Sequence, residues 1–284
     1  MTSQGRFRAD GVGRSGGGDG SERNPGDVAD DHADGADDRA GPTVPETPSL
    51  PRPAGPLGAR PGLLLLVGLA ALVLFAGLAT AVVLASGRPL LLDASSHLWS
   101  VRHRPSGAAA VARVVTGTGT GAWPYTLVVL GGLLMGRDTR GRLWAAACCL
   151  AFLSAGQGLR SGVLSLIARP RPPLGDWATH ATNWSFPSGH TATSAMVAGV
   201  LISAVLLRSP PGRAALVAFL GCWAVAVAAT RIYLGVHWFT DVVGGWFFAL
   251  AWLCLCGAAL RRLAWRWPVP PGSVAGAGAA GHPG

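Results

Sequence analysis

The sequence predicts an all-α membrane protein, a polytopic bundle of about six transmembrane helices that follows a disordered N-terminal tail. Half of the 284 residues are hydrophobic and only 13% are charged, a balance that is too apolar for an ordinary soluble domain. Several apolar stretches also approach the roughly 20 residues that a helix needs to cross a bilayer. The composition and the length of these stretches together indicate an integral membrane protein.

Charge divides the chain into two parts. The first 50 residues hold ten acidic residues and five arginines, a net charge of −5, whereas the remaining 18 arginines and four acidic residues give +14. These arginines lie at the ends of apolar segments, as the positive-inside rule of membrane proteins expects. Because this placement explains the basic character, no nucleic-acid partner is expected.

The two ends of the chain differ in composition from its middle. Residues 1–60 are rich in Gly, Pro, Asp, Ser and Thr, and such a segment buries too little apolar surface to offset the entropy lost on ordering. We therefore predict a disordered cytoplasmic tail over residues 1–60, a membrane domain over 61–267 and a disordered C-terminal tail over 268–284.

The six expected spans cover residues 62–86, 108–135, 143–167, 190–207, 214–230 and 239–260. A Gly/Thr run at residues 116–121 interrupts the second span, and it suits close helix packing better than phosphate binding because it lacks the lysine of a P-loop. The segment 88–113 mixes charges with Trp99, which is typical of an interfacial helix. Its two histidines, His97 and His103, are therefore interpreted as interfacial rather than catalytic.

Arginine-rich loops on alternate sides of these spans set the expected orientation. The loops at residues 137–142 and 208–213 face the cytoplasm under the positive-inside rule. Six spans then place both termini in the cytoplasm. Several polar residues from three separate parts of the sequence meet at the extracytoplasmic face, and these are Arg169, Arg171, His190, Arg231 and His237.

Residues 186–190, Phe-Pro-Ser-Gly-His, come directly before an apolar helix. Backbone N–H groups and the positive end of the helix dipole make such a helix N-terminus suitable for binding an anion. Phosphate is the expected ligand. Arg160 lies near the far end of the third span, where a charge is costly unless it faces a cavity or an anion. Both features indicate a phosphate site.

His237 and Asp241 stand four residues apart, which places them on one face of a helix. Asp241 can then accept a proton from one imidazole nitrogen and leave the other nitrogen free as a base or nucleophile. A purely structural role, in which Asp241 satisfies a buried histidine, also explains the pair, but it leaves unexplained why a charged residue lies in a span.

Three motifs together resemble the signature of the type 2 phosphatidic acid phosphatase family, which also includes glucose-6-phosphatase and the vanadium haloperoxidases. The motifs are Arg169-Pro-Arg171-Pro, Pro187-Ser188-Gly189-His190, and Arg231 followed by His237 and Asp241. The resemblance covers about residues 60–262.

The resemblance implies a role for each motif residue. His237 would attack phosphorus to form a phosphohistidine, Asp241 would orient it, and His190 would protonate the leaving oxygen. The phosphoryl oxygens would be held by Arg171, Arg231, Ser188 and the backbone N–H of Gly189. The family's first motif has a lysine seven residues before its last arginine, and this chain has Leu164 there. Arg160, one turn earlier on the same face, is the candidate substitute.

The expected protein is a metal-independent membrane phosphatase that acts on a lipid phosphate or a polyprenyl diphosphate at the outer leaflet. No cofactor is expected, and the cysteines and histidines lack metal-type spacing. The motifs recognise only the phosphoryl group, so they do not indicate which lipid tail the substrate carries. The sequence does not indicate the oligomeric state. One alternative is a non-catalytic lipid-phosphate binding or transport protein that retains the anion pocket, and a remoter one is a vanadate-dependent oxidase.

Overall fold

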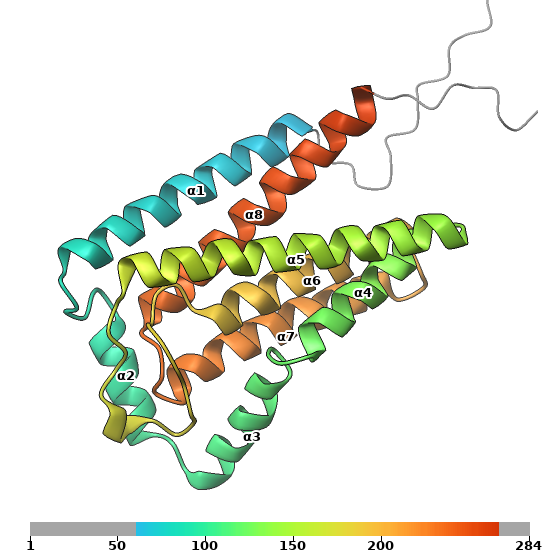
Figure 1. Cartoon of the computed structure of the whole chain (residues 1–284). Helices are drawn as coiled ribbons and strands as arrows, with labels where there is room; N and C mark the ends of the chain where they lie inside the picture. Colours follow the sequence, from blue (N-terminus) through green and yellow to red (C-terminus); the bar gives the residue numbers. More distant parts are fainter. Residues whose placement is uncertain (1–60, 267–284) are drawn as a thin grey trace, which may run out of the picture. The chain divides into compact units, whose positions relative to one another are not determined.

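The computed structural model describes residues 61–266, and every regular element within this range is a helix (Figure 1). The elements are α1 (Pro61–Leu84), α2 (Asp93–Arg102), α3 (Ser106–Gly117), α4 (Trp123–Met135), α5 (Thr139–Ile167), the 3-10 helix η1 (Leu174–Asp176), α6 (Gly189–Arg208), α7 (Arg213–Tyr233) and α8 (Phe239–Arg266). The all-helical prediction is confirmed for this part of the chain. The predicted tails, 1–60 and 268–284, lie outside the described residues.

Among residues 61–266, five helices are long and apolar enough to cross a membrane, namely α1, α5, α6, α7 and α8. Local signals in the sequence set their ends. Asp138 caps α5, since its side chain accepts a hydrogen bond from the backbone N–H of Gly141. At the other end of α5, Ala168 adopts the left-handed conformation and is followed by Arg169-Pro170, where proline prevents the helix from continuing.

The single helix predicted over residues 108–135 is wrong. The chain instead forms α3 and α4 with a break at residues 118–122, because glycine and threonine favour helices weakly and Gly121 has a φ of +67°. The 13 residues of α4 extend only about 20 Å. A Cβ atom at Gly119 would lie 2.6 Å from Cγ1 of Val227, so the break also allows a close approach to α7.

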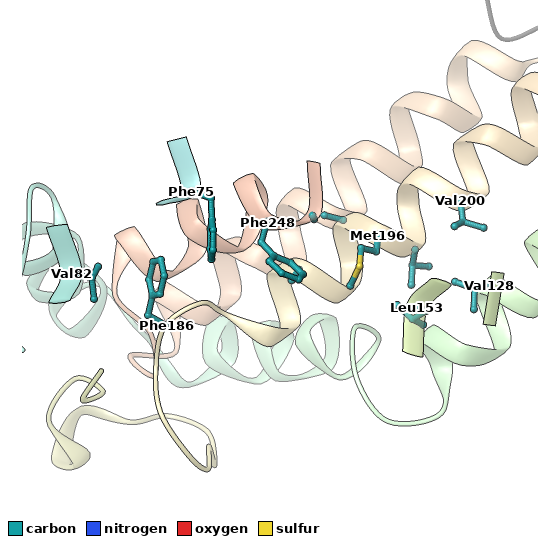
Figure 2. Close-up of a cluster of buried hydrophobic side chains, with 12 residues drawn as sticks. Phe75, Val82, Val128, Leu153, Phe186, Met196, Val200 and Phe248 are labelled. Carbon is teal, nitrogen blue, oxygen red and sulfur yellow. The ribbon is translucent and has the colours of Figure 1, made fainter. Parts of the chain in front are cut away.

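The helices pack in pairs, and a large cluster of buried apolar side chains fills the space between them (Figure 2). Helix α1 lies against α8, α4 against α5, and α6 against both α7 and α8. Phe186, fully buried, stacks on Phe75 of α1 at 5.8 Å between ring centroids, and Phe75 meets Phe248 of α8 edge-on at 5.7 Å. Aromatic contacts of this kind anchor the end of the 168–188 loop to the bundle.

One end of the bundle gathers the end of α5, the start of α6, the end of α7 and the start of α8 (Figure 1). Two glycines permit this convergence. Gly235 turns the chain between α7 and α8 with a φ of +73°, and a Cβ there would lie 2.6 Å from the carbonyl oxygen of Asp176. A Cβ at Gly245 of α8 would lie 2.9 Å from Cβ of Thr191, so α8 lies close against the first turn of α6.

Candidate active site

A cavity of about 240 Å³ lies at this end of the bundle. Its walls come from α5, the 168–188 loop, the start of α6, the end of α7 and the turn before α8. Six of the predicted site residues line it, namely Arg160, Arg171, Gly189, His190, Arg231 and His237. The loop adds a wall that sequence reasoning did not predict, formed by residues 180–184.

Two predicted site residues, Ser188 and Asp241, stand behind this lining. Both are fully buried. The backbone N–H of Ser188 donates to the carbonyl oxygen of Asp241 at 3.0 Å, and the hydroxyl of Thr191 donates to Oγ of Ser188 at 3.0 Å. These bonds tie the start of α6 to the first turn of α8, so both residues support the cavity wall from within.

The hydrogen bonds of His237 define the tautomer of its ring. Nη1 of Arg171 lies 2.9 Å from Nε2, and a guanidinium group only donates, so Nε2 must carry the lone pair. The proton then sits on Nδ1, which lies 3.4 Å from Oδ2 of Asp241. The imidazole therefore presents an unprotonated nitrogen on its Arg171 side and a proton toward Asp241, the arrangement that the spacing of the two residues predicted.

Burial also keeps the imidazole of His237 neutral. Removal from water lowers its pKa to about 4, against the opposing effect of the hydrogen bond to Asp241. Because a histidine is charged only below its pKa, the Nε2 lone pair is available throughout the neutral range.

We expect an imidazole titration with a midpoint near 4 in the folded protein. NMR of ¹⁵N-histidine-labelled protein in detergent micelles measures it, and the His237→Gln variant assigns the signal by its disappearance. A midpoint at the ordinary histidine value of about 6.5 would contradict the buried, neutral state of His237.

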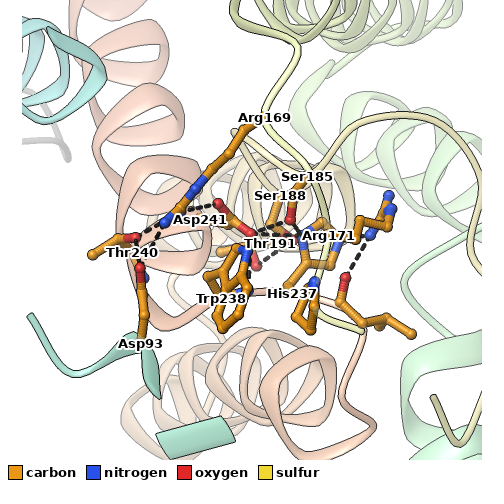
Figure 3. A network of polar contacts seen from close by, with 12 residues as sticks. Asp93, Arg169, Arg171, Ser185, Ser188, Thr191, His237, Trp238, Thr240 and Asp241 are labelled. Atoms are coloured by element: carbon orange, nitrogen blue, oxygen red, sulfur yellow. Dashed lines mark hydrogen bonds and ion pairs between the residues drawn. The ribbon is translucent and has the colours of Figure 1, made fainter. Parts of the chain in front are cut away.

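The carboxylate of Asp241 is held from several directions (Figure 3). Nη1 of Arg169 donates to Oδ1 at 2.6 Å, while the hydroxyl of Ser185 and the backbone N–H of Trp238, the latter at 2.8 Å, both donate to Oδ2. With so many donors the carboxylate stays ionised and fixed in orientation. It can therefore hold the ring of His237 in one rotamer.

Arg169 links Asp241 to a second buried carboxylate, Asp93 at the start of α2 (Figure 3). Nη2 of Arg169 lies 2.6 Å from Oδ2 of Asp93. Asp93 also accepts hydrogen bonds from the backbone N–H and the hydroxyl of Thr240 and from the backbone N–H of Leu90. All of these charged groups are at least 98% buried, so one arginine pairs with two carboxylates away from water.

The sequence places Arg169 at the outer face without a role and indicates no role for Asp93. A signal did exist, because only four acidic residues follow the N-terminal 50 residues, against 18 arginines. A carboxylate that is so rare in an arginine-rich membrane domain needs a specific partner. The spacing along the chain gave no indication of which arginine that partner is.

Backbone carbonyl groups fix the guanidinium of Arg171. Its Nε donates to Asn183 at 2.9 Å, Nη2 to Thr182 at 2.8 Å and Nη1 to Val236 at 2.7 Å. Burial lowers the pKa of Arg171, and the carboxylate of Asp241 opposes that shift. The group remains a cation beside Nε2 of His237, held in place before any ligand arrives.

Arg231, at the end of α7, also lines the cavity and is 98% buried. Its Nη1 donates to the hydroxyl of Thr116 in α3 at 3.0 Å. Among residues 61–266, its Nε has no hydrogen-bond partner. A buried N–H group without a partner is costly, and since Arg231 lines the cavity, an anion held there is a natural acceptor.

Arg160 and Leu164 both line the cavity, as expected for residues one turn apart on one helix face. The guanidinium of Arg160 lies over Gly189, where an added Cβ would stand 3.2 Å from Cζ. Its Nε donates to Oε1 of Gln157 at 3.1 Å. The arginine therefore brings a positive charge to the start of α6 from the helix that lacks the family's lysine.

The two histidines that the sequence predicts to be interfacial, His97 and His103, lie apart from this lining. His97 is buried, with Nε2 2.9 Å from Oδ2 of Asp176 in the 168–188 loop, whereas His103 stacks on Trp99. His97 therefore fastens α2 to the loop. Within residues 61–266, no group of three or more His, Cys, Asp or Glu side chains is placed to hold a metal ion.

Five long apolar helices, with a pocket of arginines and histidines at one end of the bundle, define a multi-pass membrane protein. The chain belongs to the PAP2 superfamily, whose family model matches residues 61–265.

Relatives of the chain include two kinds of lipid phosphatase. Phosphatidylglycerophosphatase B of Bacillus subtilis is 29% identical over 130 residues, which are 45% of this chain and 62% of that protein, so less than two thirds of its length is matched. Lipid A 1-phosphatase of Rhizobium etli is 28% identical over 196 residues, 58% of this chain and 80% of that protein.

A solved structure shares the fold. It is the crystal structure of a transmembrane PAP2-type phosphatidylglycerolphosphate phosphatase from Bacillus subtilis, with a TM-score of 0.59 and 25% identity. The match covers 69% of this chain and 97% of that one. The family resemblance read from the three motifs is confirmed.

Proposed function

We propose that this protein is a membrane phosphatase that hydrolyses a lipid phosphate or polyprenyl diphosphate through a phosphohistidine on His237. One observation carries the proposal most strongly. A single cavity is lined by Arg171, Arg231, His190 and the Nε2 side of His237. Cations for phosphoryl oxygens, a nucleophile and a proton donor therefore line one cavity.

In the first step, the Nε2 lone pair of His237 attacks phosphorus and forms an N–P bond. The bond between phosphorus and the leaving oxygen breaks, and that oxygen takes a proton from His190. Arg171 and Arg231 stabilise the charge on the phosphoryl oxygens. Asp241 accepts the Nδ1 proton in a hydrogen bond and so stabilises the positive charge that develops on the ring.

In the second step, water attacks the phosphohistidine on the opposite face of phosphorus. His190, now neutral, removes a proton from that water, and the N–P bond breaks to release inorganic phosphate. Both steps use the same residues, and the cycle ends with His190 protonated again. The backbone N–H of Gly189, which lines the cavity, adds to phosphate binding at the start of α6, whereas Ser188 supports that helix start from behind the lining. Arg160 supplies the charge that is missing at Leu164.

The proposed orientation follows from the arginine-rich loops. With the five long apolar helices and the shorter apolar helix α4 as a sixth crossing, both termini face the cytoplasm, and the cavity opens on the extracytoplasmic side. Lipid substrates would then reach it from the outer leaflet. The printed names of the relatives, a phosphatidylglycerophosphatase and a lipid A 1-phosphatase, support a lipid phosphate as substrate.

The alternative, a lipid-phosphate binding or transport protein without turnover, is suggested by the missing lysine at Leu164. This alternative does not explain the Asp241–His237 pair, because a protein that only binds an anion needs no oriented nucleophile. The two proposals differ in phosphate release.

Purified protein in detergent is assayed for phosphate release from phosphatidic acid, phosphatidylglycerophosphate and a polyprenyl diphosphate, each with EDTA present. We expect release from at least one substrate, with activity unchanged by EDTA. Binding of these lipids without release would favour the alternative. Activity that EDTA abolishes and a divalent cation restores would contradict the metal-independent mechanism.

A further inference from the structure

The burial pattern of α2 is the reverse of that of an amphipathic helix in a soluble protein. Its buried side chains are polar, namely Asp93, His97 and Ser100, which are at most 5% exposed and share one face of the helix. Leu98 and Trp99 lie outside this face and are 50% and 57% exposed. The helix therefore packs on the protein through polar groups and presents apolar groups to its surroundings.

The exposed apolar surface continues before α2 and beside it. Leu91 and Leu92, directly before the helix, are both exposed. Trp99 also lines an apolar groove of about 740 Å³, whose other walls come from α3 and α7 and include Val111 and Ile232. An apolar surface of this extent marks a contact with lipid or with another protein.

The position of α2 in the chain favours lipid as the partner. The apolar span α1 ends at Leu84, an exposed side chain, shortly before α2 begins, so α2 lies at the level where the hydrocarbon of the bilayer ends. Trp99 and the exposed Arg102 stand three residues apart on this helix. An aromatic ring beside a long cationic side chain is typical of residues that anchor a helix at the membrane–water interface.

The length of α2 gives a physical reason for such a contact. A helix of ten residues is marginal by itself and gains its stability mainly from the packing of an apolar face. In α2 the polar face makes the hydrogen bonds and ion pairs, whereas Leu98 and Trp99 stay exposed within the described part of the chain. The bilayer can supply the apolar packing that the protein does not.

The polar face of α2 contacts groups that support the active site (Figure 3). Asp93 pairs with Arg169, which pairs with Asp241, each at 2.6 Å. His97 contacts Asp176 of the 168–188 loop, and the same loop forms a wall of the active-site cavity. A displacement of α2 would therefore disturb both the carboxylate that orients the nucleophile and this wall.

We propose that the exposed face of α2 is a docking surface for the bilayer leaflet at the active-site end, and that the docked helix positions the catalytic carboxylate through the Asp93–Arg169 pair. Hydrocarbon chains of bulk membrane lipid cover Leu98 and Trp99, while Arg102 binds lipid phosphate oxygens. The effect on turnover rests on the proposed phosphatase function, whereas the docking does not.

Fluorescence quenching in proteoliposomes tests the docking without turnover. The full-length protein is placed in phosphatidylcholine whose acyl chains carry bromine near the glycerol end, and the emission of Trp99→Phe is subtracted from that of the wild type. The Trp99 component should lose about half of its intensity or more, because an interfacial ring touches these chains. The component isolated in the same way with Trp177→Phe, a ring that packs against a buried apolar cluster, should lose much less.

Two results would overturn the docking surface. One is a Trp99 component that the brominated lipid does not quench. The other is a wild-type protein that light scattering shows to be a dimer in detergent, with a Leu98→Gln/Trp99→Gln variant that is a monomer, since a second copy of the chain would then cover this face.

Turnover in phosphatidylcholine vesicles tests the link to the active site. Leu98→Gln/Trp99→Gln should lower kcat for a lipid phosphate by about tenfold with KM nearly unchanged, because the cavity keeps its phosphate-binding arginines while the carboxylate loses its fixed position. Leu98→Ile/Trp99→Phe keeps an apolar face and should retain the wild-type kcat. Leu84→Gln, which changes an exposed apolar side chain at the end of α1, should stay within about twofold of the wild type.

A wild-type kcat in the Leu98→Gln/Trp99→Gln variant would overturn the positioning role of α2. If the wild type releases no phosphate from any lipid while Trp99 is still quenched, the proposed function and the positioning role both fail, and the docking surface stands.

Discussion

Replacement of His237 by alanine is expected to lower phosphate release from a lipid substrate by about a thousandfold or more, since it removes the nucleophile. The side chain is 98% buried and its only role in the proposed chemistry is to present Nε2 to phosphorus. The measurement is kcat/KM for His237→Ala and His237→Gln in detergent. The glutamine variant preserves most of the side-chain volume, so a loss shared by both variants reports chemistry rather than packing.

His103→Ala is the matched control for this prediction. His103 follows α2, stacks on Trp99 and lies outside the cavity lining. Its removal should leave kcat/KM within about twofold of the wild-type value, as is usual for a surface substitution away from a special contact. Full activity of the His237→Ala variant would show that His237 is not the nucleophile.

Replacement of Arg169 by methionine is expected to destabilise the protein by about 3–5 kcal/mol, the usual cost of leaving a buried charge without its partner. Here two carboxylates, Asp93 and Asp241, lose the same cation. The expected result is a strong fall in melting temperature in detergent, together with loss of activity because Asp241 no longer holds the ring of His237. Thermal unfolding followed by circular dichroism measures the first effect.

Two further variants distinguish the loss of these ion pairs from a nonspecific loss of stability. Asp93→Asn keeps the Arg169–Asp241 pair and should cost less than Arg169→Met. The double variant Asp93→Asn/Arg169→Met leaves only one uncompensated carboxylate, so it should be more stable than Arg169→Met alone. An Arg169→Met protein that melts at the wild-type temperature would show that the buried ion pairs do not stabilise the bundle.

The sequence predicted the parts of the fold that depend on the length of apolar stretches. Spans such as α1 and α6 stand out because a bilayer demands a continuous apolar helix. Residues 108–135 do not form the single helix that their average apolar composition predicts, because local glycines and threonines end the helix. Hydropathy over a long window does not register a five-residue break.

Similar limits apply to the site. The spacing of His237 and Asp241 predicted their pairing, and their atoms do face each other. The bond between Arg169 and Asp93 joins residues 76 positions apart, and no periodicity links them. The carbonyl groups that hold Arg171 belong to the backbone of a loop. Every residue has a backbone carbonyl group, so the side-chain types along that loop do not predict these hydrogen bonds.

Covalent capture of the phosphoryl group tests the central claim most directly. The protein is mixed with a lipid substrate labelled with ³²P in the terminal phosphoryl group, quenched in alkali within milliseconds, digested and sequenced by mass spectrometry. The proposed mechanism predicts an acid-labile, alkali-stable phosphate on the peptide that contains His237, absent from His237→Gln. Turnover with no label on any peptide, or label on His190 in its place, would contradict the assignment of His237 as nucleophile.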